Sequence, residues 1–591
     1  MAREVTPSRM QTVVKRGFER VESYARAQAM FVKEFVGQYY TARKGMTGDE
    51  PLNLLFTTLR TMVPNLVMRN PVNDVTTRIT AYRQYGELLG LALNQSQEDR
   101  KLEQVLRAWI IGAFFGLGIV KTGISASGEM IQHGDQNIDP GQIYTKIVSI
   151  DDFVFDPVCT DLYESTFCGD RIRVPRQILL DTDGYDHDLV KRLPTSRYGD
   201  NKRAEEISKR NMSQLEMLDL QDYVDVVELW VPEAEALVTI PDPTQTTFDK
   251  YIRLAEYYGP KEGPYTYLSF TPPVPKNPLP VAPVSLLYDI HLMANRMFTK
   301  IMEQADRQKD VLGYHPSVAD EAKDIVDAKD GDAIAMTDPK MAQMFSYGGQ
   351  NRGNEAMLQE MQMWYNYMAG NPDQMAGNLT AGTRGSKETA TRSSILQGNA
   401  SITTDDARHI IYTQTAEISG KEAWYFHTDP LINMPLTKRA SGGRQIQLWL
   451  TPEQRMGDFL KFVFKIKARS MSYLNPEIRS KRIMEFGTNL IPAIMNAAMV
   501  AMQAGLQFNA QKVLTDMAVE MGIEEDVMDW FDDPEFEQKM MMYAQMGPQN
   551  PGKAGMAGVL QNNGNPMARN IMSSGQEFNQ QAQMGANQGT Y

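Results

Sequence analysis

Residues Val284 to Gln308 read VSLLYDIHLMANRMFTKIMEQADRQ, and no glycine or proline interrupts them. Apolar side chains recur every three or four residues, at Leu286, Ile290, Met293, Met297 and Ile301. This spacing places them on one face of a helix. At about 1.5 Å per residue, such a helix is about 37 Å long.

Two further helical stretches follow this first one. Asn354 to Met368 carries methionines and a tryptophan along one face, and Gly370 to Gly385 is rich in residues that break helices. No proline then occurs before Pro430, so a third helix of about 40 residues and about 60 Å can form. A helix of that length is typical of a coiled coil, a membrane span or an element shared between subunits.

Composition excludes several classes of protein. The 591 residues carry a formal net charge of −13, which opposes wrapping by nucleic acid and suits a surface past which DNA slides. The longest apolar run, Trp109 to Val120, is too short to cross a bilayer, and the N-terminus has no apolar core of a signal peptide. Cys159 and Cys168 fit neither a disulfide framework nor a zinc site. We therefore expect a soluble protein of a reducing cytoplasm.

The rest of the chain combines helical and strand patterns. Helical periodicity covers residues 11–40, 52–67 and a long region from 73 to 118, whereas strand patterns occur at 143–148, 153–155, 223–231, 251–270, 445–450 and 459–466. Between the first two long helices, a helix at 318–328 capped by Ser317 and a strand at 331–336 predict a small module. Helices rich in methionine and alanine follow from 475 to 546, and the Gly/Gln/Asn/Met-rich tail at 547–591 is predicted to be disordered.

Two glycine-rich motifs are candidate nucleotide-binding sites. Gly112, Gly116 and Gly118 lie at an apolar helix end without the preceding strand of a dinucleotide fold, which favours helix packing. Gly382 to Thr389 lacks both the spacing and the preceding strand of a P-loop. Two interpretations of that loop remain: Arg384 and Lys387 contact a polyanion, or the loop is simply exposed, with Ser386 as the helix N-cap.

Catalytic and metal sites are not indicated. The six histidines lack metal-binding spacing, and the carboxylate pairs Asp151–Asp152 and Asp405–Asp406 fit a turn and a solvated helix face. No serine lies in a nucleophile elbow. We expect a protein that is not an enzyme and has no cofactor and no metal.

The order of these elements resembles the portal protein of tailed bacteriophages, the ring at one capsid vertex through which DNA passes. The resemblance covers roughly residues 52–546. It rests on Leu102–Thr122 leading into YTKIVSIDDFVFDP at Tyr144–Pro157, on PVAPVSLLYDIHLMANRM at Pro280–Met297, on SKETATRSSILQGNA at Ser386–Ala400, and on a clip-sized insert between two long helices.

The resemblance implies an α+β, mainly α, portal fold with an α/β wing, a two-helix stem, a small α/β clip, a long spine helix and a helical crown. Carried over, these parts are the wing at 1–283 with a β return at 429–469, stem helices at 284–308 and 354–369, the clip at 309–353, a tunnel loop at 370–385, the spine at 386–428, the crown at 470–546 and the tail at 547–591. The uncharged tail departs from the family by offering no helical barrel.

It also implies functional residues. DNA contacts are expected from the tunnel loop and its exit, at Asn371, Gln374, Asn378, Arg384 and Lys387. The acidic clip residues Asp320, Glu321, Asp324 and Asp327 would face either the lumen or a docking partner. Gly398 and Gly420 are expected bend points of the spine.

The implied function is a ring, usually a dodecamer, at the portal vertex of the virion, assembled in the host cytoplasm. Its expected partners are double-stranded DNA, the terminase large subunit, the major capsid and scaffolding proteins, and head-completion or tail adaptor proteins, with no membrane. The alternatives are another virion structural protein, such as a head–tail adaptor or an internal ejection protein, and a nuclease or motor of the packaging machinery. A nuclease or motor needs a P-loop or a clustered carboxylate site, and the sequence indicates neither.

Overall fold

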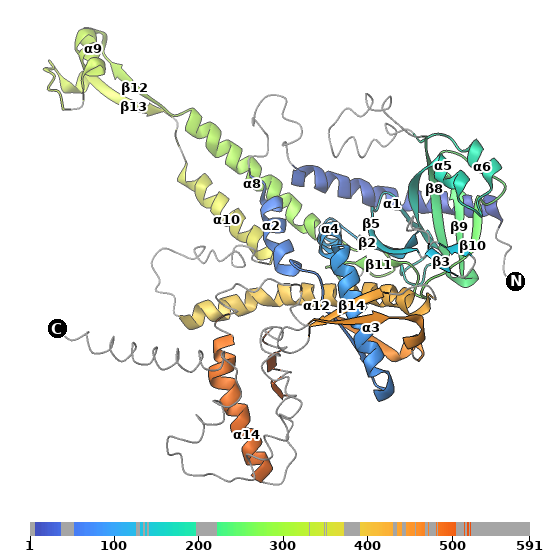
Figure 1. Cartoon of the computed structure of the whole chain (residues 1–591). Coiled ribbons are helices and arrows are strands. Elements are labelled where there is room, and N and C mark those ends of the chain that lie inside the picture. Colours follow the sequence, from blue (N-terminus) through green and yellow to red (C-terminus); the bar gives the residue numbers. More distant parts are fainter. Residues whose placement is uncertain are drawn as a thin grey trace. The chain divides into compact units, whose positions relative to one another are not determined.

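The computed structural model describes residues 6–36, 52–125, 131–133, 136–138, 141–196, 222–370 (except 273, 330, 348 and 350), 390–429, 434–439, 445–466 (except 456), 471, 480, 483–503, 513–514, 517–518 and 521. Helices and strands both contribute, so the chain is of the α+β class (Figure 1). It divides into two units, Met1–Tyr473 and Leu474–Tyr591.

The first unit begins with four helices, α1 (Pro7–Val36), α2 (Leu54–Leu66), α3 (Arg83–Asp99) and α4 (Leu102–Phe114). The predicted helical region at 73–118 is wrong at both ends. Its start, Asn73–Thr77, is strand β1, and its end enters strand β2 at Gly118. Lys101, with φ at 53°, separates α3 from α4. The pairing partner of β1 lies at residues 462–466, so the local sequence carries no signal of this pairing. This explains why residues 73–77 are predicted as helix.

The two largest antiparallel sheets have three and five strands. One has the order β11–β2–β5 and the other β10–β9–β8–β7–β6. Their strands are β2 (Gly118–Ser125), β5 (Gln142–Val148), β6 (Phe153–Phe155), β7 (Cys168–Pro175), β8 (Tyr223–Val231), β9 (Ala236–Pro241), β10 (Arg253–Glu256) and β11 (Tyr265–Leu268), with the hairpin β3 (Ile131–His133) and β4 (Gln136–Ile138) and the helices α5 (Arg176–Asp181) and α6 (His187–Arg192) between them in sequence. One apolar core joins both sheets to α1, through side chains such as Val21, Ile119 and Phe153.

A helical hairpin follows the proline-dense segment. Helix α8 (Pro283–Asp306) packs along α10 (Arg352–Met368), where the sequence predicts the first two long helices. We call these two helices the hairpin, and residues 307–351 between them the insert. The insert contains β12 (Lys309–Tyr314) paired with β13 (Ala342–Tyr347), and α9 (Ala319–Asp327).

Two details of the predicted insert are wrong. Residues 331–336 form no strand, and the strands lie instead at the two ends of the insert, where they can pair. Ser317 does not cap the helix, because it lies inside the 3₁₀ turn Pro316–Val318, whose N-cap is His315.

Helix α12 (Ala390–Thr428) is the longest helix that the structure describes. It packs against α2, α3, β2, β11 and β16 (Phe462–Ile466). β16 pairs with β1, so residues almost 400 positions apart form one two-stranded sheet, with Asn73 opposite Ile466. β14 (Met434–Arg439) and β15 (Gln445–Leu450) pair with each other and pack on α3.

The second unit contains α14 (Ile491–Gln503), preceded by a π-helical turn at Phe486–Leu490. Its described core consists of Phe486, Ile494, Ala498, Leu514 and Ala518. Apolar residues at helical spacing account for this packing.

Candidate functional site

The hairpin is fixed at one end and carries the insert at the other. Near the end of α10, the Tyr365 and Thr58 hydroxyls hydrogen-bond at 2.9 Å in a buried position, which ties α10 to α2. At the other end, the Asn354 amide donates to Gln304 Oε1 at 2.9 Å and joins α10 to α8. Both contacts are side-chain hydrogen bonds between separate helices, so they hold α10 in its position against α2 and α8.

Helix α10 has an exposed apolar face. Trp364 is 53% exposed and Tyr367 71% exposed, and Tyr365 is the only residue of α10 that is fully buried. The exposed large apolar residues of this face, which we call the α10 face, are Met357, Met363, Trp364, Tyr367 and Met368. These side chains lie on one side of the helix, with the exposed Glu360 among them. Exposed tryptophan and tyrosine are typical of interaction sites, because they are the side chains most enriched at the centres of protein interfaces.

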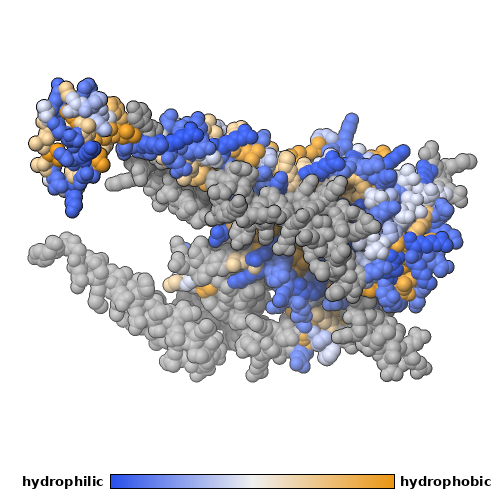
Figure 2. Space-filling model, turned by 90° about the horizontal axis from the view of Figure 1, so that it is seen from above, coloured by the Kyte–Doolittle hydropathy of each residue, from blue (hydrophilic) through white to orange (hydrophobic). Residues whose placement is uncertain are grey.

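The insert is mixed in character. On α9, Asp320, Asp324 and Asp327 are exposed, while Glu321 is half-buried and accepts a hydrogen bond from the Thr337 backbone N–H at 3.0 Å. Figure 2 shows hydrophobic residues beside hydrophilic ones on this part of the surface. The exposed apolar residues are Val311, Tyr314, Val326, Met341, Met344 and Phe345. The insert therefore offers apolar and acidic groups side by side.

Helix α12 is held to the body by polar side chains. The Arg408 guanidinium donates two hydrogen bonds to the Asn65 carbonyl, at 3.2 and 3.1 Å, and forms an ion pair with Asp405. Three turns further, the buried Lys421 ammonium pairs with Glu417 at 2.8 Å and donates to Thr266 Oγ1 at 2.8 Å. Burial lowers the pKa of Lys421, and Glu417 opposes that shift.

Glu422, on the same helix, is fully buried and has three partners. It accepts hydrogen bonds from Gln97 at 2.8 Å and Thr145 at 2.6 Å, and Arg100 pairs with it at 3.0 Å. Gln97 lies in α3 and Arg100 caps the C-terminal end of that helix, whereas Thr145 lies in β5. One carboxylate therefore links α3 and β5 to α12.

We expect Glu422→Ala to lower the free energy of unfolding of the first unit by about 3 kcal/mol or more, because it leaves a largely buried cation unpaired. Glu422→Gln keeps hydrogen-bonding capacity and should cost about 1–2 kcal/mol. Urea titration followed by tryptophan fluorescence measures both. Both substitutions remove the charge, so the difference between them measures the hydrogen bonds from Gln97 and Thr145, and equal losses would show that these bonds add nothing to the ion pair with Arg100.

The most enclosed ion pairs join the two sheets. Lys121 on β2 lies 2.5 Å from both Asp170 on β7 and Glu228 on β8, and its side chain is only 3% exposed. The two carboxylates are directly opposite each other in the sheet register, and the Tyr265 hydroxyl donates to Asp170 at 2.6 Å. Burial lowers the pKa of Lys121, but Glu228 and Asp170 outweigh it and hold the pKa above its usual value.

The sequence prediction missed this cluster. Its one local signal is Lys121 directly after the apolar run Trp109 to Val120, because a lysine buried there needs a counter-charge. The identity of that counter-charge depends on strand pairing.

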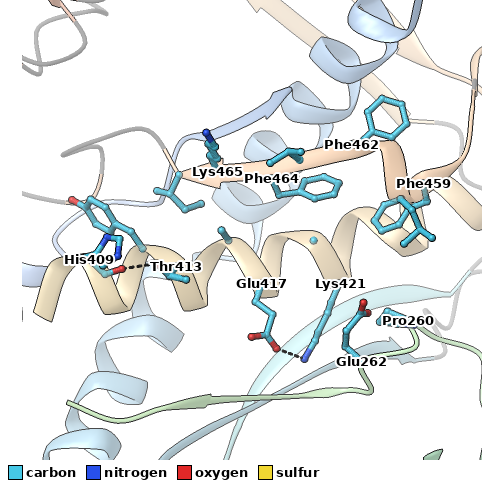
Figure 3. A pocket seen from close by; sticks show the side chains of 16 residues that line it. Pro260, Glu262, His409, Thr413, Glu417, Lys421, Phe459, Phe462, Phe464 and Lys465 are labelled. Atoms are coloured by element: carbon cyan, nitrogen blue, oxygen red, sulfur yellow. Dashed lines mark hydrogen bonds and ion pairs between the residues drawn. The ribbon is translucent and has the colours of Figure 1, made fainter. Parts of the chain in front are cut away.

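A groove of about 780 Å³ runs beside α12 (Figure 3). His409, Thr413, Glu417 and Lys421 line it along successive turns of the helix. The aromatic rings of Phe459, Phe462 and Phe464 form the other wall, and the rings of Phe459 and Phe464 stack at 5.4 Å. The lining is mainly apolar surface, with charged groups from α12 at its edge.

The predicted DNA-contacting residues Asn371, Gln374, Asn378, Arg384 and Lys387 lie outside the described residues. α12 is a single helix through both Gly398 and Gly420, so bending at these positions stays a prediction. A Cβ at Gly420 would lie 3.5 Å from the Phe464 ring, which is an ordinary van der Waals contact, so packing at this position does not require a glycine.

In the part of the chain that the structure describes, no helix has the length and apolar character needed to cross a membrane. Within the same residues, no three histidine, cysteine, aspartate or glutamate side chains gather into a possible metal site. No protein-family model and no curated protein sequence matches this chain.

Proposed function

We propose that this chain is a portal protein, the subunit of a ring that forms the DNA channel at one vertex of a phage capsid. The observation that carries the proposal is the hairpin with its insert and its exposed α10 face. A closed ring needs each subunit to present two different complementary surfaces, joined head to tail. The α10 face supplies one surface with the aromatic and methionine side chains that such contacts use.

The remaining features suit that role. Hydrogen bonds and ion pairs of Arg408, Lys421 and Glu422 hold the long helix α12 against the rest of the first unit. The helix can therefore act as a rigid element of the subunit. A net charge of −13 per chain keeps a channel from binding DNA tightly, because each phosphate contact would act as a brake. In this proposal the insert meets the terminase motor and then the neck proteins, and the capsid and scaffolding proteins contact the wing.

We expect the purified chain to form closed rings with a central hole, because the α10 face is left exposed in a single subunit. Negative-stain images and sedimentation velocity at micromolar concentration test this. Monomers alone under those conditions would argue for another virion component, such as an adaptor.

A further inference from the structure

Helix α1 presents a basic face on an otherwise acidic protein. Its apolar side, including Val14, Val21 and Phe31, is buried in the core. The exposed cations on the opposite side, which we call the α1 stripe, are Arg9, Lys15, Arg16, Arg26 and Lys33. At 100° per residue they fall within an arc of about 120°. The whole chain has a net charge of −13, so the positive charge of the stripe is opposite in sign to the net charge of the protein.

The stripe has five cations and three carboxylates on the same side of α1, so it keeps a net positive charge. Arg26 pairs with Glu22 at 2.6 Å, with side chains 70% and 45% exposed, so that pair is weak. Glu19 and Glu34 are the other carboxylates on this side of the helix. Among the residues that the structure describes, Arg9, Lys15, Arg16 and Lys33 form no ion pair. Four cations along one rigid helix therefore face solvent together.

The chemistry of the stripe fits a phosphate backbone better than a protein or a membrane. A protein interface needs apolar anchors at its centre, and Met30 is the one large apolar side chain exposed on α1. Membrane insertion would need the apolar face of the helix, and that face is packed in the core. Arginine binds phosphate oxygens with two N–H groups at once, which favours an oligophosphate.

The length of the stripe agrees with a duplex. Arg9 and Lys33 are separated by about 36 Å along the helix axis, close to one turn of B-form DNA at about 34–36 Å. We propose that the α1 stripe binds the phosphate backbone of double-stranded DNA without sequence preference. This site is separate from the predicted channel loop, and it is present in a single subunit, so it does not rest on ring formation.

The proposal predicts weak, strongly salt-dependent binding. Four phosphate contacts give a slope of log affinity against log salt of about −3.6, so affinity rises about 150-fold between about 200 mM and about 50 mM salt. Fluorescence anisotropy of a labelled duplex of about 30 base pairs, titrated with the full chain, measures it. Two duplexes of different sequence should bind equally.

A charge-matched pair of variants locates the site. The test variant combines Arg9→Gln, Lys15→Gln, Arg16→Gln and Lys33→Gln. The control combines Arg78→Gln, Arg83→Gln, Lys250→Gln and Lys261→Gln, which removes the same charge from exposed positions elsewhere. We expect the test variant to lose at least about tenfold in affinity at about 50 mM salt and most of its salt slope, and the control to stay within about twofold.

Equal losses in the two variants, or an unchanged salt slope in the test variant, would overturn the proposal. The same samples are imaged for rings. Rings without DNA binding by the wild-type chain would reject the α1 site alone and leave the portal proposal standing. If the test variant keeps its DNA affinity but no longer forms rings, the α1 stripe contacts a neighbouring copy instead.

Discussion

Lys121→Met is expected to lower the free energy of unfolding of the first unit by about 3–5 kcal/mol, the usual cost of removing one partner from a buried ion pair. The loss arises because Asp170 and Glu228 then face each other across β7 and β8 without the ammonium between them. Urea titration of the wild type and the variant measures it. A variant within about 1 kcal/mol of the wild type would show that Lys146, 3.7 Å from Asp170, can take over its role.

Two further measurements separate charge from packing in this cluster. Adding Asp170→Asn and Glu228→Gln to Lys121→Met should restore much of the loss, because the uncompensated charges are gone. In Lys121→Met alone, Asp170 and Glu228 are two neighbouring negative charges without a cation between them. Their mutual repulsion raises the pKa of one of the two carboxyl groups in the folded state. The folded state then binds a proton more tightly than the unfolded state, so the variant should gain stability as pH falls from 7 to about 5 and lose it as pH rises again.

Trp364→Asp is expected to abolish ring assembly without unfolding the subunit. The side chain lies on the α10 face, where it is half-exposed in the single chain, so an aspartate there is tolerated by the monomer. At an interface centre, loss of a tryptophan weakens each contact by about 2–4 kcal/mol, or about 30- to 700-fold. Sedimentation velocity and negative-stain imaging would detect the missing rings, and thermal unfolding would check the fold.

The matched control is Ile178→Asp on α5. Ile178 is 53% exposed, the same as Trp364, but it lies on a different element. Rings in the control and none in Trp364→Asp would place the contact on the α10 face. Rings of normal size in Trp364→Asp would remove the observation on which the portal proposal depends.

The sequence predicted most of the helices well because their signals are local. Helix α8 at Pro283–Asp306 follows from an unbroken three-and-four spacing, and α12 from a long interval without proline. The order of long helix, small insert and long helix could likewise be predicted. Within the insert the strands were misplaced, since their pairing of Lys309 with Tyr347 brings together residues that no local pattern connects.

By itself, the sequence determined where the chain can form long uninterrupted helices and some of its strands, since periodicity, prolines and glycines act over a few residues. Only the tertiary structure decided which charges meet and which apolar faces stay exposed. The Lys121 cluster, the sheet of β1 and β16, and the exposure of Trp364 all depend on contacts between distant segments. Burial and pairing arise from the whole packing arrangement, and the free energy of each such group is set there rather than in its own stretch of sequence.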